Sequence, residues 1–594
     1  MINFPYGVSN FQRIRTYPYL YLDRTDSIHA LESMAEQLLF LRPRRFGKSL
    51  LLSTLMSYYD LNQIDQFDTL FGDLAVGKNP TPERNKYMVL QWDFSQVSPQ
   101  GDIEQIKQNL FAHIHVQAQS FVRQYANKLN GEITFFPANA LATFESLCNL
   151  VKDSGYQLYL FIDEYDNFAN EVLMHNQGDK KRYAALLEGE GILKTLFKII
   201  KAATSQKKIA RVFITGVSPV VMSDMTSGYN VVTNISLQPE FNGLCGITQT
   251  ELEGITQSVL VHCQQEHKLA EVMETMRQFY NGYLFAPEAD TKLYNPILCF
   301  HFLRHYQARC SAPRDMLDAN LAMDAGRIRY IANLQGGQKV LDHILDEQND
   351  LSLTQLASDF GVANLQRVQQ HSSYMISLLY YFGVLTLNGL SGMGALQLVI
   401  PNLAVRHLYL DELKRQALPN MADEAKAEQL ALQFYQSGDL QPIINFMEQR
   451  YLKVFSNRDY RWSNELTIKT MFASLLFNDI YYTLDSEAEL ARRYTDLVMI
   501  MRPNMRQFPD LKEFVMEFKF ISLGDLGLSA EDLKCKTPQE LKLLPAVQKL
   551  LNDAVEQLRH YRQVLADKYQ EPQRLFALAV VALGFERLVW QRSE

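Results

Sequence analysis

Three consecutive residues near the start of the chain, Gly47, Lys48 and Ser49, have the types and the order needed to bind phosphate. They follow an apolar run at 38–41, interpreted as a buried strand, and precede an apolar segment with helical spacing. In such a turn, backbone N–H groups and the helix N-terminus face one point, and Lys48 adds a full positive charge there. The Ser49 hydroxyl can bind a magnesium ion. The three residues are therefore interpreted as the second half of a P-loop, G-K-[ST].

The residues before Gly47 depart from the P-loop pattern. Arg42 stands where the first glycine of GxxxxGK[ST] belongs, and the interior of the loop is filled by Pro43, Arg44, Arg45 and Phe46. Arg44 or Arg45 could contact phosphate, and an exposed basic turn explains the two charges about equally well. We predict that Arg42–Ser49 as a whole binds the phosphates of a nucleotide.

Polar side chains also follow two later apolar runs. The run LYLFI, of the kind expected for a buried parallel strand, ends in Asp163 and Glu164, and the run IARVFI ends at Thr215, with Ser218 close behind. An ATPase needs a phosphate cradle, a magnesium ligand and a group that orients water. We assign the magnesium ligand to Asp163, the water-orienting catalytic role to Glu164, and contact with the γ-phosphate to Thr215 and Ser218. The alternative is that the two carboxylates only make a strand end soluble.

A second group of chemical residues lies near the end of the chain. In the predicted strands YTDLVMIM and FVMEFKF, alternation places Asp496 on one strand and Glu517 and Lys519 together on one face of the next. Two carboxylates can hold Mg²⁺ or Mn²⁺, and a lysine can orient water or stabilise charge on a phosphate. Phosphodiester hydrolysis requires such an arrangement, but a solvated edge-strand face is the alternative. Glu465, on the apolar face of a predicted helix, is either a third acidic group or a charge at the helix N-terminus.

The elements around these residues predict a multidomain α/β protein. In the first part, strands alternate with helices, which favours a parallel, doubly wound sheet that binds its ligand at the carboxyl ends of the strands. The middle is mostly helical and has a small hairpin around Asn388-Gly389 and Ser391-Gly392; a winged helix and a plain helical connector explain it equally well. From about residue 440 the pattern is again α/β. The predicted domains are 1–310, 311–440 and 441–594.

Composition sets only wide limits. A chain of 594 residues is too long to form a single hydrophobic core. Its apolar fraction of 47% is ordinary for a soluble globular protein. A net charge of -8 neither supports nor excludes a DNA partner. The six cysteines form no CxxC pair, which argues against a zinc site or a disulfide framework and favours a reducing compartment. Without a signal pattern or an apolar run near 18 residues, we expect a cytoplasmic protein with no membrane span.

Several motifs together are similar to a known family. RPRRFGKS, FIDEYD and FITGVSP resemble the bacterial AAA-ATPase-like family, a P-loop branch in which Arg typically replaces the first glycine. YLYLDRT, PEFNGLCGIT, YNGYLF and YNP resemble the same family, so that the likeness covers roughly residues 1–310. The resemblance implies ATP as the ligand of Arg42–Ser49 and a Walker B role for Asp163 and Glu164.

The end of the chain resembles a second family. The order helix, strand, strand, helix, strand, with E…D…ExK…QxxxY, is similar to the PD-(D/E)XK nuclease superfamily. The resemblance implies a restriction-endonuclease-like domain with magnesium on Asp496 and Glu517.

The two resemblances lead to one expected function and one alternative. We expect an ATP-binding and ATP-hydrolysing protein whose metal-dependent nuclease cuts nucleic acid, with DNA as the first candidate; a role in defence against foreign DNA is a family-level analogy. The alternative is an ATP-dependent switch or assembly protein whose nuclease-like domain binds a partner or nucleic acid without cleavage. A homo-oligomer is compatible with this branch of ATPases, although no sequence feature fixes a subunit number.

Overall fold

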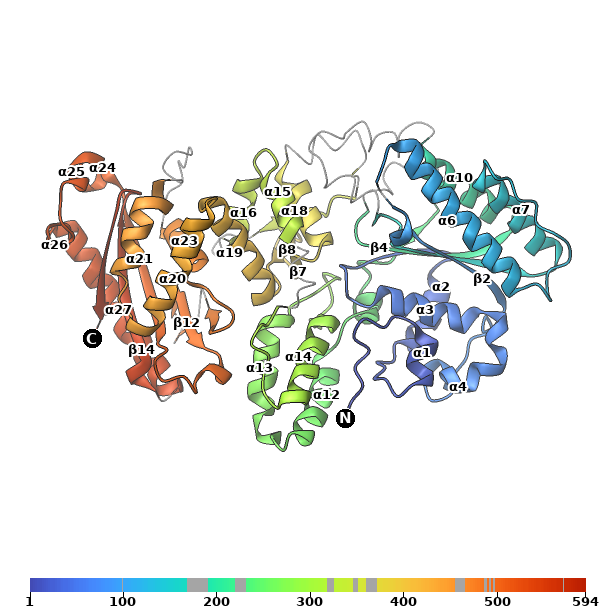
Figure 1. The fold of residues 1–594 in the computed structure, drawn as a ribbon, viewed down its shortest axis with the longest axis horizontal. Coiled ribbons are helices and arrows are strands. Elements are labelled where there is room, and N and C mark those ends of the chain that lie inside the picture. Colours follow the sequence, from blue (N-terminus) through green and yellow to red (C-terminus); the bar gives the residue numbers. More distant parts are fainter. Residues whose placement is uncertain are drawn as a thin grey trace. The chain divides into compact units, whose positions relative to one another are not determined.

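The structure is a computed structural model that describes residues 1–98, 100–167, 191–219, 231–317, 325–345, 351–358, 360, 371–453, 465–485, 489–490, 493–494, 497–569 and 571–593. The chain divides into two compact units (Figure 1). The first comprises Met1–Cys310, Arg329–Val340 and Asp350–Pro401, and the second comprises Ser311–Ile328, Leu341–Asn349 and Asn402–Glu594.

A five-stranded parallel sheet forms the centre of the first unit, with the strand order β2-β3-β4-β1-β5. Its strands are β1 (Gln37–Leu41), β2 (Tyr87–Asp93), β3 (Gln157–Asp163), β4 (Ile209–Gly216) and β5 (Thr233–Asn234). The apolar runs of β1, β3 and β4 are almost entirely buried, as expected for strands covered on both faces. The expected parallel P-loop sheet is therefore present. The two-residue strand β5 is too short to give a sequence signal.

Helices cover both faces of this sheet, with α6, α7 and α10 on one face and α2 and α3 on the other (Figure 1). Side-chain caps start three of the helices, because Asn10, Asp102 and Asn139 accept hydrogen bonds from the first-turn N–H groups of α1, α6 and α7. The helix bounds are α1 (Phe11–Thr16), α2 (Ile28–Met34), α3 (Lys48–Tyr59), α4 (Phe67–Phe71), α5 (Ala75–Lys78), α6 (Ile103–Gln124), α7 (Ala140–Asp153) and α10 (Ile192–Ser205).

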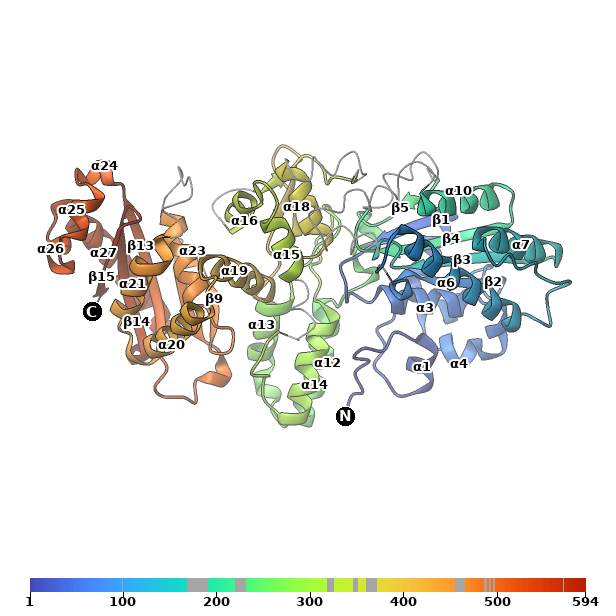
Figure 2. The same ribbon diagram turned by 45° about the horizontal axis from the view of Figure 1, so that its top comes forward.

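Three helices, α12 (Gln249–His262), α13 (Leu269–Tyr280) and α14 (Pro296–Arg309), pack side by side after the sheet (Figures 1 and 2). A disulfide joins Cys263, after α12, to Cys310, after α14. The expectation of no disulfide was wrong at this pair. The two cysteines are 47 residues apart, and only the packing of the two helices brings them together.

The first unit also contains a small antiparallel sheet with the order β6-β8-β7. The expected hairpin is confirmed as β7 (Thr386–Leu390) and β8 (Leu396–Val399). Helix α18 (Ser372–Tyr381) precedes it, and β6 (Ser352–Leu353) interrupts a stretch that the sequence predicted as helical. Helices α15 (Ala325–Ala332) and α16 (Gly337–Leu345) come earlier. Residues 361–370 lie outside the described residues, so the winged helix remains a hypothesis.

A mixed five-stranded sheet with the order β15-β14-β13-β12-β9 organises the second unit. Strands β13 and β14 are parallel, and the other pairs are antiparallel. The strands are β9 (Tyr482–Asp485), β12 (Leu497–Met501), β13 (Glu513–Ile521), β14 (Leu575–Leu583) and β15 (Arg587–Ser593), and a separate pair is β10 (Glu489–Leu490) with β11 (Arg493–Tyr494).

Helices lie on both sides of this mixed sheet. Helix α27 (Pro545–Tyr569) covers one face, and α20 (Met421–Ser437), α21 (Gln441–Phe446) and α23 (Glu465–Leu476) cover the other (Figure 1). The rings of Phe472 on α23 and Phe518 on β13 lie 5.0 Å apart. The remaining helices are α19 (Leu403–Ala417), α24 (Leu523–Leu526), α25 (Ala530–Lys534) and α26 (Pro538–Lys542).

The segment Tyr19–Asp23, which begins the YLYLDRT motif, forms only an isolated bridge from Tyr19 to Asn3. Asp23 instead accepts hydrogen bonds from Thr25 and Ala75, which turn the chain. No described helix is both long and apolar enough to span a membrane.

Candidate functional site

Lys48 is the first residue of α3, directly after Gly47, whose φ of 99° only glycine adopts easily. The Lys48 ammonium is buried and donates hydrogen bonds to the carbonyl oxygens of Arg42 and Pro43, at 3.0 and 3.1 Å. Burial lowers the pKa of Lys48, and the nearby charge of Glu164 opposes this effect. The loop therefore holds a cation between its own carbonyl groups and the carboxylate at the end of β3.

Arg42, predicted to bind phosphate, is directed into the protein. Its guanidinium donates to the carbonyl oxygens of Ser236 and Phe241, each at 2.8 Å, and lies 4.4 and 4.2 Å from the ring centroids of Phe40 and Phe285. Burial lowers the pKa of Arg42 to about 10. These contacts hold the loop against the segment after β5, so Arg42 has a structural role.

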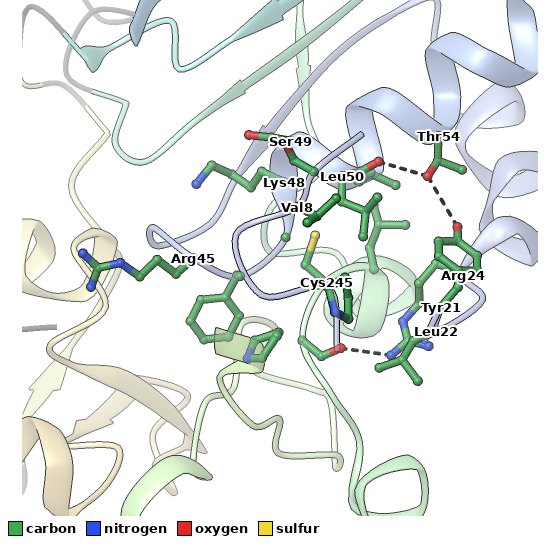
Figure 3. A pocket seen from close by; sticks show the side chains of 18 of the residues that line it. Val8, Tyr21, Leu22, Arg24, Arg45, Lys48, Ser49, Leu50, Thr54 and Cys245 are labelled. Carbon is green, nitrogen blue, oxygen red and sulfur yellow. Dashed lines mark hydrogen bonds between the residues drawn. The ribbon is translucent and has the colours of Figure 1, made fainter. Parts of the chain in front are cut away.

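The other side chains of the loop also differ in their surroundings. Phe46 packs edge-on against Tyr283, with ring centroids 4.8 Å apart, and is buried. Arg45 has a left-handed backbone, and it lines the same cavity as Lys48 and Ser49 (Figure 3). Arg44 donates a hydrogen bond of 2.7 Å to the side-chain oxygen of Asn167.

The carboxylates at the end of β3 are held by its neighbours. Asp163 is buried, and it accepts hydrogen bonds from the Thr215 hydroxyl and, at 3.0 Å, from the Glu164 N–H. Glu164 adopts a positive φ of 48°, which turns the chain sharply away from the strand. Burial raises the pKa of Glu164, and Lys48 and then Arg44 counteract that rise. The structure thus brings Lys48, Asp163, Glu164 and Thr215 together.

Asp166 also belongs to this region, although its position in the sequence did not predict this. Its buried carboxylate accepts hydrogen bonds from the N–H groups of Val217 and Ser218, the latter at 2.7 Å, and from the Ser218 hydroxyl. Ser218, predicted to contact the γ-phosphate, is completely buried and directs its hydroxyl to Asp166 instead. The repeated acidic residue in FIDEYD was the available signal, but its role depends on the neighbouring strand.

A cavity of about 300 Å³ adjoins the P-loop (Figure 3). One end is lined by Lys48, Ser49 and Glu164, and the remainder is mostly apolar, with Val8, Leu22, Leu244, Cys245, Ile297 and Phe300 among its walls. A charged end and an apolar body suit the phosphates and the base of a nucleotide. These apolar residues come from four segments that are far apart in the chain, so no local sequence pattern predicted that they line a cavity.

The available oxygen donors fit a magnesium ion bound together with phosphate. Ser49 and Asp163 both line a second, polar cavity of about 560 Å³, to which Asp93 at the end of β2 also contributes. Mg²⁺ commonly takes one or two protein oxygens and completes its shell with water and phosphate. Within the part of the chain that the structure describes, no three His, Cys, Asp or Glu side chains are grouped so as to hold a metal ion by themselves.

The second cluster lies in the other unit, on β13 and α23. The Lys519 ammonium contacts Glu517 at 2.8 Å and Glu465 at 3.3 Å. The Glu517 side chain is 5% exposed and that of Glu465 is 41% exposed. Asp496, the other predicted metal ligand, lies outside the described residues, directly before β12. The structure therefore brings three of the four predicted residues together.

Glu465 is the first residue of α23, a position at which a carboxylate also interacts favourably with the helix dipole. Its contact with Lys519 is compatible with an auxiliary acid as well. Both interpretations from the sequence stay open.

The order of the parallel strands, the loop before α3 and the carboxylates after β3 define a P-loop nucleotide-binding domain. Residues 5–226 match the model of the AAA-ATPase-like family, described as a predicted AAA-ATPase. Residues 5–226 are thus similar to this family, and this part of the expected resemblance is confirmed.

Comparison with individual proteins adds a relative of similar length. The chain is 22% identical over 547 residues to an uncharacterized protein from the vnfD 5′ region of Azotobacter chroococcum mcd 1, a match that covers 90% of this chain and 92% of the relative. Two solved structures overlap with 66% of the chain. The Walker-type ATPase of Pyrococcus abyssi is 15% identical, with 96% of its chain covered and a TM-score of 0.36. The Aeropyrum pernix Orc1 protein, solved in complex with DNA, is 12% identical, with 92% covered and a TM-score of 0.23. Both overlaps are loose.

Proposed function

We propose that this protein hydrolyses ATP in its first unit and cuts nucleic acid, with DNA as the substrate, in its second. The observation that carries the first half is that Lys48, Ser49 and Glu164 line one cavity beside the P-loop, while Ser49 and Asp163 line a second. The second half rests on the contact of Lys519 with two carboxylates.

In the ATP site, Lys48 would exchange its two loop carbonyl partners for phosphate oxygens. Ser49 and Asp163 would hold Mg²⁺, which neutralises charge on the phosphates when bound. The Thr215 hydroxyl fixes the orientation of Asp163. Glu164 would accept a hydrogen bond from the attacking water and so orient it toward the γ-phosphate.

In the second unit, Asp496 and Glu517 would hold Mg²⁺ or Mn²⁺, Lys519 would orient water or stabilise the scissile phosphate, and Glu465 would assist. The mixed sheet, with the parallel pair β13 and β14 connected through α27, supports a restriction-endonuclease-like fold. The proposal also includes the domains 1–310, 311–440 and 441–594, a winged helix in the middle one, and control of DNA cleavage by the ATP site.

Two assays test the two halves separately. For the ATPase, turnover of Mg²⁺-ATP should be measurable for the wild type and absent for Lys48→Ala, while a partly exposed lysine on α6, changed as Lys107→Ala, serves as the matched control. For the nuclease, plasmid and linear DNA are incubated with Mg²⁺ or Mn²⁺, with and without ATP. Cleavage that survives Glu517→Ala unchanged would assign the activity to a contaminant.

One observation favours the alternative of a binding domain that does not cut. The Lys519 ammonium already contacts both carboxylates, and a lysine whose only role is to stabilise the fold would make the same contacts. Under this alternative, DNA binding measured by fluorescence anisotropy persists while no cleavage occurs with either metal ion.

A further inference from the structure

The three arginines of the P-loop have different surroundings, and Arg44 contacts the turn that carries Glu164. The guanidinium of Arg42 is bound to carbonyl oxygens inside the protein, and Arg45 lines the cavity beside Lys48 (Figure 3). Arg44 instead donates a hydrogen bond of 2.7 Å to Asn167. Arg44 is therefore the loop arginine directed toward the carboxylates after β3.

Asn167 is a buried acceptor for this hydrogen bond. It is 7% exposed, and its backbone N–H donates to the Glu164 carbonyl at 2.9 Å, which closes the turn after β3. Between these two residues, the Tyr165 hydroxyl donates to the Ser218 carbonyl at 2.7 Å, and Asp166 accepts from the Ser218 N–H. The turn that carries Asn167 is thus hydrogen-bonded to the end of β4.

The position of Arg44 relative to Glu164 and Lys48 follows from electrostatics. The Arg44 guanidinium contacts Asn167, three residues after Glu164, and the charges of Lys48 and then Arg44 both act to lower the pKa of Glu164. In the proposed ATPase, Glu164 orients the water that attacks the γ-phosphate, and this phosphate must lie between Lys48 and that water. A guanidinium near Glu164 is therefore near the third phosphate of ATP, beyond the two phosphates that ADP shares with it.

We propose that Asn167 is a positioning residue that holds the Arg44 guanidinium at the γ-phosphate end of the nucleotide site, so that the protein distinguishes ATP from ADP. The inference rests on the proposed ATP-binding function. A guanidinium suits this task because its planar donors match phosphate oxygens, and such charge-assisted hydrogen bonds are stronger than neutral ones. Holding it in place beforehand reduces the ordering that binding would otherwise require.

Calorimetric titration with ADP and with a non-hydrolysable ATP analogue, each with Mg²⁺, tests this proposal on the full chain. Arg44→Gln should weaken binding of the ATP analogue by about 10-fold or more and change ADP binding by less than about 3-fold. Asn167→Ala should cause a smaller loss of the same kind. The double variant should match Arg44→Gln alone, because Asn167 acts only through Arg44. Two exposed residues at the end of α6 and just beyond it, changed as Arg123→Gln and Asn127→Ala, serve as matched controls.

The selectivity for ATP over ADP separates positioning from simple loss of structure. An equal loss for both nucleotides in Asn167→Ala, or a double variant clearly weaker than Arg44→Gln, would overturn the inference while the ATP-binding function stands. A wild type that binds neither nucleotide would overturn the proposed function, and the inference with it.

Discussion

The nucleotide site and the acidic cluster both contain a lysine beside carboxylates, buried in the case of Lys48 and half-buried in the case of Lys519, yet they are held together in different ways. In the first unit, Lys48 donates to two loop carbonyl groups, and Asp163 accepts from a hydroxyl and a backbone N–H. In the second, Lys519 contacts Glu517 and Glu465 directly. The backbone positions the charges of the first site, whereas the charges of the second position one another.

The two sites therefore lose different contacts when they bind a ligand. A phosphate can replace the carbonyl partners of Lys48 without leaving a carboxylate unpaired, so the first site is ready for an anion. A metal ion in the second site competes with Lys519 for Glu517.

The largest expected difference concerns the two lysines. Lys519→Met removes the ammonium that the buried Glu517 carboxylate contacts, and we expect it to lower the free energy of unfolding by about 3 kcal/mol. Lys48→Met removes two hydrogen bonds to loop carbonyl groups, but it also removes the cost of burying an ammonium, so its effect should stay within about 1 kcal/mol. Chemical denaturation followed by circular dichroism measures both. Equal losses would show that the two sites are held in the same way.

Substitution of Arg42 tests whether the loop is stabilised by side chains that do not bind phosphate. Arg42→Gln should lower the free energy of unfolding by about 2 kcal/mol, because the carbonyl groups of Ser236 and Phe241 lose buried donors. Its effect on the preference for ATP over ADP should be smaller than that of Arg44→Gln. A stable Arg42→Gln protein with altered selectivity would instead place Arg42 at the phosphates.

A third charged group, His407 in the second unit, gives a prediction for pH. Burial alone would lower the pKa of His407, but Asp411 and Asp479, at 3.1 and 3.4 Å, outweigh it and raise this pKa to about 10. Since the folded-state pKa exceeds the unfolded value, the stabilisation is complete below about pH 6.5 and is lost as the pH rises toward 10. We expect a loss of about 2 kcal/mol between pH 7 and pH 9 in denaturant titrations. His407→Gln should remove this part of the pH dependence; an unchanged profile would contradict the assignment.

The smallest effect is expected at Glu465. Its side chain is 41% exposed, so Glu465→Gln should cost less than about 1 kcal/mol in the same denaturation assay. DNA cleavage then separates its two interpretations. Cleavage that falls more than about 10-fold supports an auxiliary acid, and unchanged cleavage supports a charge at the helix N-terminus.

Much of the fold could be predicted from the sequence where hydrophobic pattern and strand length were strong. The runs that became β1, β3, β4 and β14 are continuous and apolar, because both faces of these strands are covered. Strands β9 and β15 were missed, since they lie at the edges of the mixed sheet and carry mixed polar patterns.

The sequence predicted only those residues of the candidate site whose role follows from their position at the end of a strand. Lys48, Asp163, Glu164 and Thr215 stand at strand ends, where a parallel sheet brings residues together. The structural role of Arg42 could not be predicted, because its partners at Ser236 and Phe241 lie far along the chain. The role of Asn167 depends in the same way on a contact with the loop that no local pattern encodes.

The central claim is that the first unit is an ATPase in which Lys48 binds the phosphates and Glu164 orients water. Its most direct test is the nucleotide retained by Glu164→Gln after incubation with Mg²⁺-ATP and removal of free nucleotide, identified by chromatography. We predict that Glu164→Gln retains intact ATP while the wild type converts ATP to ADP. Conversion by Glu164→Gln at the wild-type rate would contradict this account.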